Sequence, residues 1–167
     1  MGSPLGPVLA DIFLAKLETE SLGPLIDCFD HYYRYMDDIF CITHKDISLE
    51  DILAEFNGAH PAIKFTYELE QDGQLSFLDV HLSRRTDGSI LRKTNRKKTW
   101  TGQYTNFSSF VPLKYKRNLV HCLTSRARKI CSEDALEDEM KSIQNTLREN
   151  GYPERFIQRN MQPKITP

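Results

Sequence analysis

The chain lacks the hallmarks of several large protein classes. No C-x-x-C pair and no set of accompanying histidines is present, which argues against a zinc site. Cysteines are also too few, at four in 167 residues, to form a disulfide framework, so we expect reduced thiols in an intracellular protein. No long apolar run is present, and Asp11 and Lys16 interrupt the N-terminal stretch. We therefore expect neither a signal peptide there nor a membrane partner.

Basic residues are scarce in the first half of the chain and concentrated after it. Residues 1–83 contain four basic and fifteen acidic side chains, a formal charge of −11, whereas residues 84–131 contain thirteen basic and one acidic, or +12. Residues 132–167 return to −2. A block of this charge is typical of a surface that binds a polyanion, and interleaved aromatic residues favour nucleic acid. The alternative is that the block neutralises the acidic half within the fold.

The first part of the chain shows both helical and strand patterns. Apolar residues at three- and four-residue spacing predict an amphipathic helix that begins near Pro7 and ends at Gly23-Pro24. Residues 31–43 are rich in Tyr, Phe and Ile and predict two short strands around a tight turn. Ser48 should cap a second helix.

Alternation then replaces the helical pattern. Residues 63–69 alternate apolar and polar side chains and predict a strand, which turns at Asp72-Gly73 into a return strand over residues 75–82. Asp87-Gly88 should turn the chain once more, towards Ile90-Leu91.

The last third predicts helices. Pro112 can begin a helix through residue 130, Ser132 should cap a helix that Asn150-Gly151 ends, and Pro153 should begin a short third one. The expected fold class is therefore α+β. We expect an antiparallel α+β unit at 1–92, a basic linker at 93–105, a small all-helical unit at 106–161 and a tail at 162–167.

The string Tyr35-Met36-Asp37-Asp38 carries the sharpest chemical signal. Adjacent carboxylates on one strand point to opposite faces, but in a tight turn between strands both can converge on one point. Oxygen ligands of this kind suit Mg²⁺, and such ions assist phosphoryl transfer. An ordinary acidic hairpin turn is the alternative.

Two motifs in this order resemble those of a known family. Residues 2–10 (GSPLGPVLA) are similar to the "SPLGP" motif B of reverse transcriptases, and residues 34–40 (RYMDDIF) to their Y-x-D-D motif C. The downstream pattern, from SFLDVHLSRRTDGSI through RARKIC to ENGYPE, is similar to Penelope-like retroelements. The resemblance covers nearly the whole chain and implies a partial polymerase palm followed by a helical segment.

The resemblance implies a role for each matching residue. Asp37 would bind catalytic Mg²⁺ directly and Asp38 would support the metal site. Lys64 would stand where motif D could supply a proton to pyrophosphate, although an exposed strand lysine is the commoner explanation. The residues implied near the template, primer terminus and incoming nucleotide are Gly2, Ser3, Pro4, Tyr35 and Met36.

The chain also departs from the family pattern. The motif A Asp and the basic fingers lie upstream of motif B in the family and are not found here, and Asp11 cannot replace that Asp. We therefore expect this chain alone not to polymerise DNA from an RNA template, DNA primer and deoxynucleotides, and expect that an upstream fingers and palm segment of the same element would be needed. The resemblance implies that a functional element would act in the nucleus.

The basic half offers a second function. On a helical wheel Lys114, Arg117, His121 and Arg128 form one stripe, which could contact phosphates as a polymerase thumb does or belong to a small helix-turn-helix-like module. A solvated basic face is the alternative. The residues expected to bind nucleic acid are Arg92, Lys93, Arg96, Lys97, Lys98, Lys114, Arg117 and Arg128. The chain is thus an inactive reverse transcriptase fragment, a non-catalytic nucleic-acid-binding protein, or a functionless remnant that exposes apolar surface.

Overall fold

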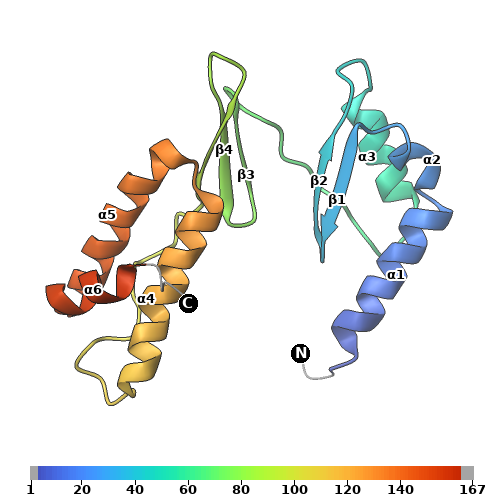
Figure 1. The fold of residues 1–167 in the computed structure, drawn as a ribbon. Helices are drawn as coiled ribbons and strands as arrows, with labels where there is room; N and C mark the ends of the chain where they lie inside the picture. The colour runs from blue at the N-terminus through green and yellow to red at the C-terminus, as the bar shows by residue number, and fades with distance from the viewer. Residues whose placement is uncertain (1–3, 163–167) are drawn as a thin grey trace, which may run out of the picture. The chain divides into compact units, whose positions relative to one another are not determined.

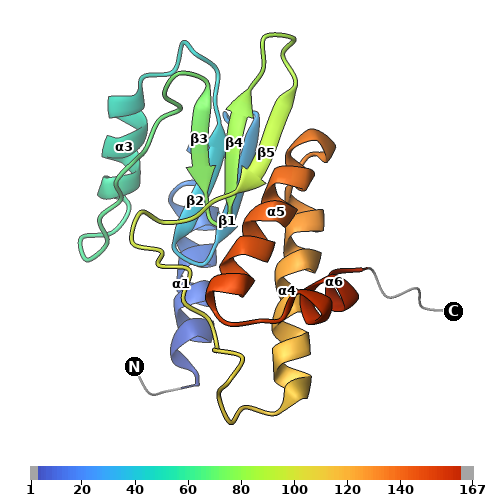
Figure 2. The same cartoon turned by 90° about the vertical axis from the view of Figure 1, so that its left-hand side faces the viewer.

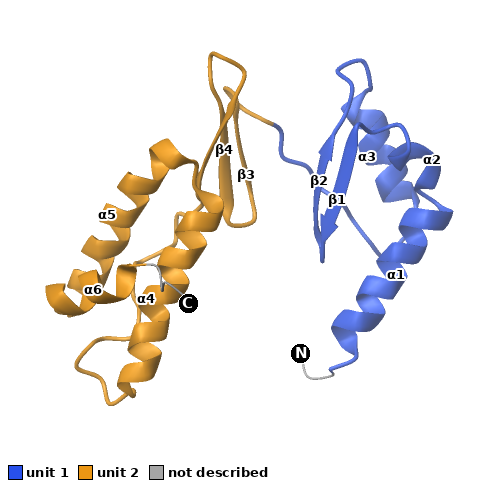
Figure 3. Cartoon of the chain, in the orientation of Figure 1, with its two compact units in different colours: residues 1–69 blue, residues 70–167 orange. Residues whose placement is uncertain are grey.

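The structure is a computed structural model that describes residues 4–162. Its helices and small antiparallel sheets confirm the expected α+β class. The chain divides into two compact units between Leu69 and Glu70 (Figure 3).

The first unit contains α1 (Gly6–Glu20), α2 (Gly23–Ile26), β1 (His31–Tyr35), β2 (Asp38–Ile42) and α3 (Leu49–Gly58) (Figure 1). Proline occupies the first turn of α1, as expected, because its fixed φ suits that position. Ser48 caps α3 by accepting a hydrogen bond of 3.3 Å from the Asp51 backbone N–H.

The core of this first unit is small. Its buried apolar residues are Leu17, Leu22, Phe29, Ile52 and Phe56. Only the C-terminal part of α1 contributes to this core, because Val8, Leu9 and Ile12 are more than half exposed. These side chains leave an exposed apolar surface along the first turns of α1, of the kind that marks an interaction site or a tendency to aggregate.

The strand predicted at residues 63–69 is wrong: the segment has no regular secondary structure and pairs with no strand of the described residues. Ile63 and Phe65 pack on the core of the first unit, which accounts for the first two apolar residues of the alternation. The Asn57 side chain takes the place of a neighbouring strand, accepting a hydrogen bond of 2.8 Å from the Phe65 N–H and donating one of 3.3 Å to the Phe65 carbonyl. Tyr67 and Leu69 remain exposed.

The second unit begins with a three-stranded antiparallel sheet in the order β3 (Gln74–Phe77), β4 (Val80–Arg84), β5 (Ile90–Thr94). The predicted return strand over 75–82 is therefore two strands, joined by a two-residue turn in which Leu78 has a φ of 51°. The Asp87-Gly88 turn joins β4 to β5 as expected.

Three helices complete the second unit: α4 (Leu113–Ile130), α5 (Glu133–Glu149) and α6 (Glu154–Met161). Figure 2 shows α4 and α5 side by side, with α6 packed beside α4. The bounds confirm the predicted starts after Pro112, Ser132 and Pro153. Their shared core comprises Val120, Ala127, Ile143, Leu147, Tyr152, Ile157 and Met161.

The sheet and the helices are joined by hydrogen bonds. The Ser132 N–H donates to the Arg92 carbonyl at 3.0 Å, and the Arg92 N–H donates to the Ser132 hydroxyl at 2.9 Å. The unit boundary after Leu69 thus differs from the expected one after Arg92, because β3 to β5 pack with the helices.

The segment expected to be a linker, residues 93–105, is also packed onto the helices. The buried Asn150 side chain accepts a hydrogen bond from the Tyr104 N–H at 2.9 Å and donates one to the Gly102 carbonyl at 2.8 Å. The Tyr152 hydroxyl donates to the Thr105 carbonyl at 2.9 Å. None of the helices within residues 4–162 combines the length and apolar content needed to cross a bilayer.

Candidate nucleic-acid interface

The β1–β2 hairpin carries the acidic pair at its exposed end. Tyr35 pairs with Asp38 in the ladder, so Met36 and Asp37 form the two-residue turn. Met36 has a φ of 55°, which an L residue adopts at some cost. Asp37 and Asp38 are both exposed, as are Tyr35 and Met36.

Arg34 fixes this turn to α1. Its guanidinium donates to Glu18 at 2.6 Å and to Asp11 at 2.7 Å, and also to the Met36 carbonyl at 3.1 Å. These hydrogen bonds, to Glu18 first, raise the pKa of Arg34 above its ordinary value. Asp11 therefore binds Arg34 from α1.

Other residues implied for the polymerase site stay apart from this turn. No hydrogen bond or ion pair among residues 4–162 links Lys64, exposed on the segment after α3, to Asp37 or Asp38. Pro4 precedes α1 and is exposed, while Gly2 and Ser3 lie outside the described residues. Within the described residues no cluster of three His, Cys, Asp or Glu side chains is present, so Asp37 and Asp38 provide only two carboxylates towards a magnesium site.

The second unit has the opposite charge to the first. Residues 70–167 contain 18 basic and 11 acidic side chains, a formal charge of +7, whereas residues 1–69 contain four and twelve, or −8. Helix α4 contributes most to this difference, since it contains six Lys or Arg residues and no acidic one. A net positive charge of this size favours the approach of anions over cations.

Six of the eight residues predicted to bind nucleic acid are exposed and have no acidic partner among the described residues. They are Arg92, Lys93, Lys97, Lys98, Lys114 and Arg117. The two others hold the fold together. Arg96 forms two hydrogen bonds with Glu139, the longer 2.9 Å, and Arg128 donates to the Met161 carbonyl at 3.0 Å.

Helices α5 and α6 form a helix, a four-residue turn and a second helix. The turn spans residues 150–153, and Gly151 adopts a φ of 79°, which ends α5 with little strain. Ile157 and Met161 bury one side of α6 against the core. Turns of three or four residues that contain glycine are typical of helix-turn-helix motifs, in which the second helix enters the major groove of DNA.

The exposed side of α6 bears two arginines that the sequence did not single out. Arg155 and Arg159 lie one turn apart, are exposed, and have no partner among the described residues. Gln158 lies between them and donates to Glu154 at 2.9 Å. The sequence signal for this pair is the spacing of four residues, which places both side chains on one face of the helix that follows Pro153.

The comparisons with known proteins bear on this second unit. Residues 103–162 match the family model of the animal helix-turn-helix domain. No curated protein and no solved structure matches the chain. Over α4, α5 and α6 the match and the geometry therefore agree on a helix-turn-helix arrangement.

Proposed function

We propose that the second unit binds DNA through α6, with the basic surface of α4 contacting phosphates. The observation that carries this proposal is the exposed Arg155 and Arg159 on the second helix of the α5–turn–α6 motif. Arginine side chains there can reach guanine edges, while lysine and arginine elsewhere neutralise the backbone.

Charge and burial support α6 in this role. Helix α5 has ion pairs and an acidic first turn, with Glu133 and Asp134, that disfavour phosphate contact. Helix α6 buries Ile157, Asn160 and Met161, so its remaining side is free to face a partner. Arg148 binds Glu154 at 2.7 Å, which partly neutralises the one acidic residue at the start of α6.

The double variant Arg155→Ala/Arg159→Ala tests the proposal. Fluorescence anisotropy with a short mixed-sequence duplex should show binding at least about tenfold weaker, because a good arginine–base pair contributes about 1–3 kcal/mol. The control Lys16→Ala/Lys45→Ala removes the same charge from exposed positions in the first unit and should bind as the unaltered chain does. Equal affinity of both double variants would refute the role of α6.

Salt dependence gives a second readout. Affinity should fall steeply with added salt, and the slope should become shallower when phosphate-contacting cations such as Lys114 and Arg117 are removed. Asp37→Ala should leave duplex binding unchanged under this proposal, since that residue belongs to the other unit.

We also propose that the first unit derives from the palm of a Penelope-like reverse transcriptase. The specific observation in its favour is the two-residue turn that presents Asp37 and Asp38 at the exposed end of a hairpin. Animal helix-turn-helix domains occur in transposon-related proteins, which is consistent with such an origin. A functional element of this origin would act in the nucleus.

A primer-extension assay with RNA template, DNA primer, deoxynucleotides and Mg²⁺ tests this origin. The chain alone should not incorporate nucleotides, because two carboxylates hold the ions poorly. Adding a polypeptide that supplies fingers and a motif A strand should restore incorporation, and Asp37→Ala should abolish it. Incorporation by the chain alone, or restored incorporation that survives Asp37→Ala, would contradict the proposal.

A further inference from the structure

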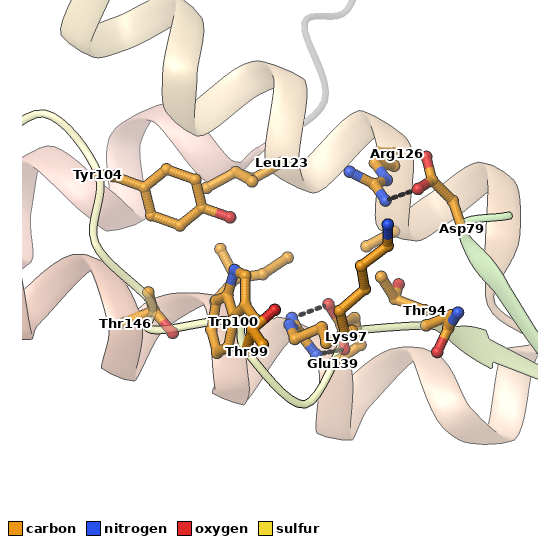
Figure 4. A pocket seen from close by; sticks show the side chains of 14 residues that line it. Asp79, Thr94, Lys97, Thr99, Trp100, Tyr104, Leu123, Arg126, Glu139 and Thr146 are labelled. Atoms are coloured by element: carbon orange, nitrogen blue, oxygen red, sulfur yellow. Dashed lines mark hydrogen bonds and ion pairs between the residues drawn. The ribbon is translucent and has the colours of Figure 1, made fainter.

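The segment that follows β5 encloses a cavity of about 330 Å³ against α4 and α5 (Figure 4). One end is aromatic: Trp100 and Tyr104 lie with their ring centroids 6.5 Å apart at an angle of 62°. The other end carries Lys97, Arg126 and Asp79, and apolar side chains of the two helices lie between the ends. The volume falls within the range of small-molecule sites.

The charges of the cavity favour an anion. Its two carboxylates both have partners, since Glu139 binds Arg96 and Asp79 binds Arg126 at 2.6 Å. Lys97 has no partner among the described residues. A cationic ligand would therefore have to displace an arginine, whereas an anionic group can approach the Lys97 ammonium directly.

The aromatic end favours a planar ligand. Trp100 is 41% exposed, so part of its indole is accessible for stacking. The Arg96 guanidinium lies 4.8 Å from the ring centroid of Trp100 and, with its two bonds to Glu139, limits the positions the indole can take. Gly102 lies beside the same ring, and its φ of +71° is a backbone conformation that favours glycine.

We infer that this cavity binds one unstacked nucleotide of a single-stranded nucleic acid, its base on Trp100 and its phosphate at Lys97. Base stacking on aromatic side chains combined with a basic groove is the usual basis of single-strand binding. The inference rests on the proposed nucleic-acid function of this unit but uses residues distinct from α6.

Trp100 provides a local readout, because it is the chain's single tryptophan. Titration of the full chain with a short mixed-sequence single-stranded DNA should quench its fluorescence in a saturable manner. The variant Lys97→Glu should weaken this binding at least about tenfold. Lys98→Glu is the matched control, since Lys98 is also exposed and adjacent but does not line the cavity, and it should have a smaller effect.

The outcomes are distinguishable. Absence of quenching, or equal weakening by Lys97→Glu and Lys98→Glu, would overturn the inference. Deoxyadenosine monophosphate serves as a second probe: saturation by it at the oligonucleotide's concentration would reassign the cavity to free nucleotides and overturn the strand-binding inference. The variant Arg155→Ala/Arg159→Ala should retain quenching by the single strand, so failure of duplex binding through α6 and failure of this cavity are read separately.

Discussion

We expect the side chain of Asn150, at the C-terminal end of α5, to make a large contribution to the stability of the second unit. Its side chain accepts a hydrogen bond from the Tyr104 N–H and donates to the carbonyls of Gly102 and Thr146 at 2.8 and 2.7 Å. It thereby attaches the segment after β5 to the helices. Asn150 is buried, so its loss would leave polar atoms without partners.

The variant Asn150→Ala removes these three bonds. Thr146 keeps a second donor, the Asn150 backbone N–H at 3.2 Å, so two main-chain groups lose their partner. Each group left without a partner costs about 1–3 kcal/mol, so the two together give about 2–6 kcal/mol for the variant. The backbone contributes little, because alanine adopts the Asn150 φ of −88° readily.

Urea unfolding followed by Trp100 fluorescence measures this cost in the second unit alone, since that unit contains the chain's one tryptophan. The control Asn118→Ala changes an exposed asparagine on α4 that has no hydrogen-bond partner among the described residues, and should change the free energy of unfolding by no more than about 0.5 kcal/mol. Equal unfolding free energies for Asn150→Ala and Asn118→Ala would refute the reasoning.

Three further predictions concern stability, pH and association. Lys116→Met should lower the free energy of unfolding of the second unit by about 2 kcal/mol, because the buried ammonium donates to two loop carbonyls at 2.6 and 2.7 Å; urea unfolding that matches the unaltered chain would contradict this. Burial, then the hydrogen bond to Glu18, raises the pKa of Tyr32, so the unfolded chain releases that proton at lower pH than the folded unit. The first unit should therefore lose stability as pH rises above about 10, and Tyr32→Phe should reduce that slope in unfolding followed by circular dichroism. Leu9→Glu/Ile12→Glu should reduce self-association in light scattering without lowering the helix content, since both side chains are about 60% exposed. Unchanged scattering would show that the exposed apolar surface of α1 does not mediate self-association.

Local rules made several features predictable from the sequence alone. Helices begin as expected after Ser48, Pro112 and Ser132, and Gly151 ends α5. Ser48 caps α3 with its side chain, whereas Ser132 makes no cap hydrogen bond in α5 and accepts one from the Arg92 N–H instead. The hairpin around Asp37 was likewise determined by adjacent β-forming residues and a short turn.

Alternation of side chains was a weaker guide. Residues 63–69 have the pattern of a strand, yet a strand needs a partner, and here Asn57 occupies that position. Only Ile63 and Phe65 of its four apolar residues pack on the core, and the pattern says nothing of which backbone lies alongside.

The function of each cation was decided only by the tertiary structure. Arg96 and Lys97 are neighbours in a basic segment, but Glu139 lies 43 residues beyond Arg96 and binds it, while Lys97 faces the cavity. Arg155 and Arg159 became candidates because α6 buries its opposite side. The sequence by itself determined how much positive charge the second unit carries, and long-range packing decided which charges remain free for a partner, because an ion pair depends on distances that composition does not specify.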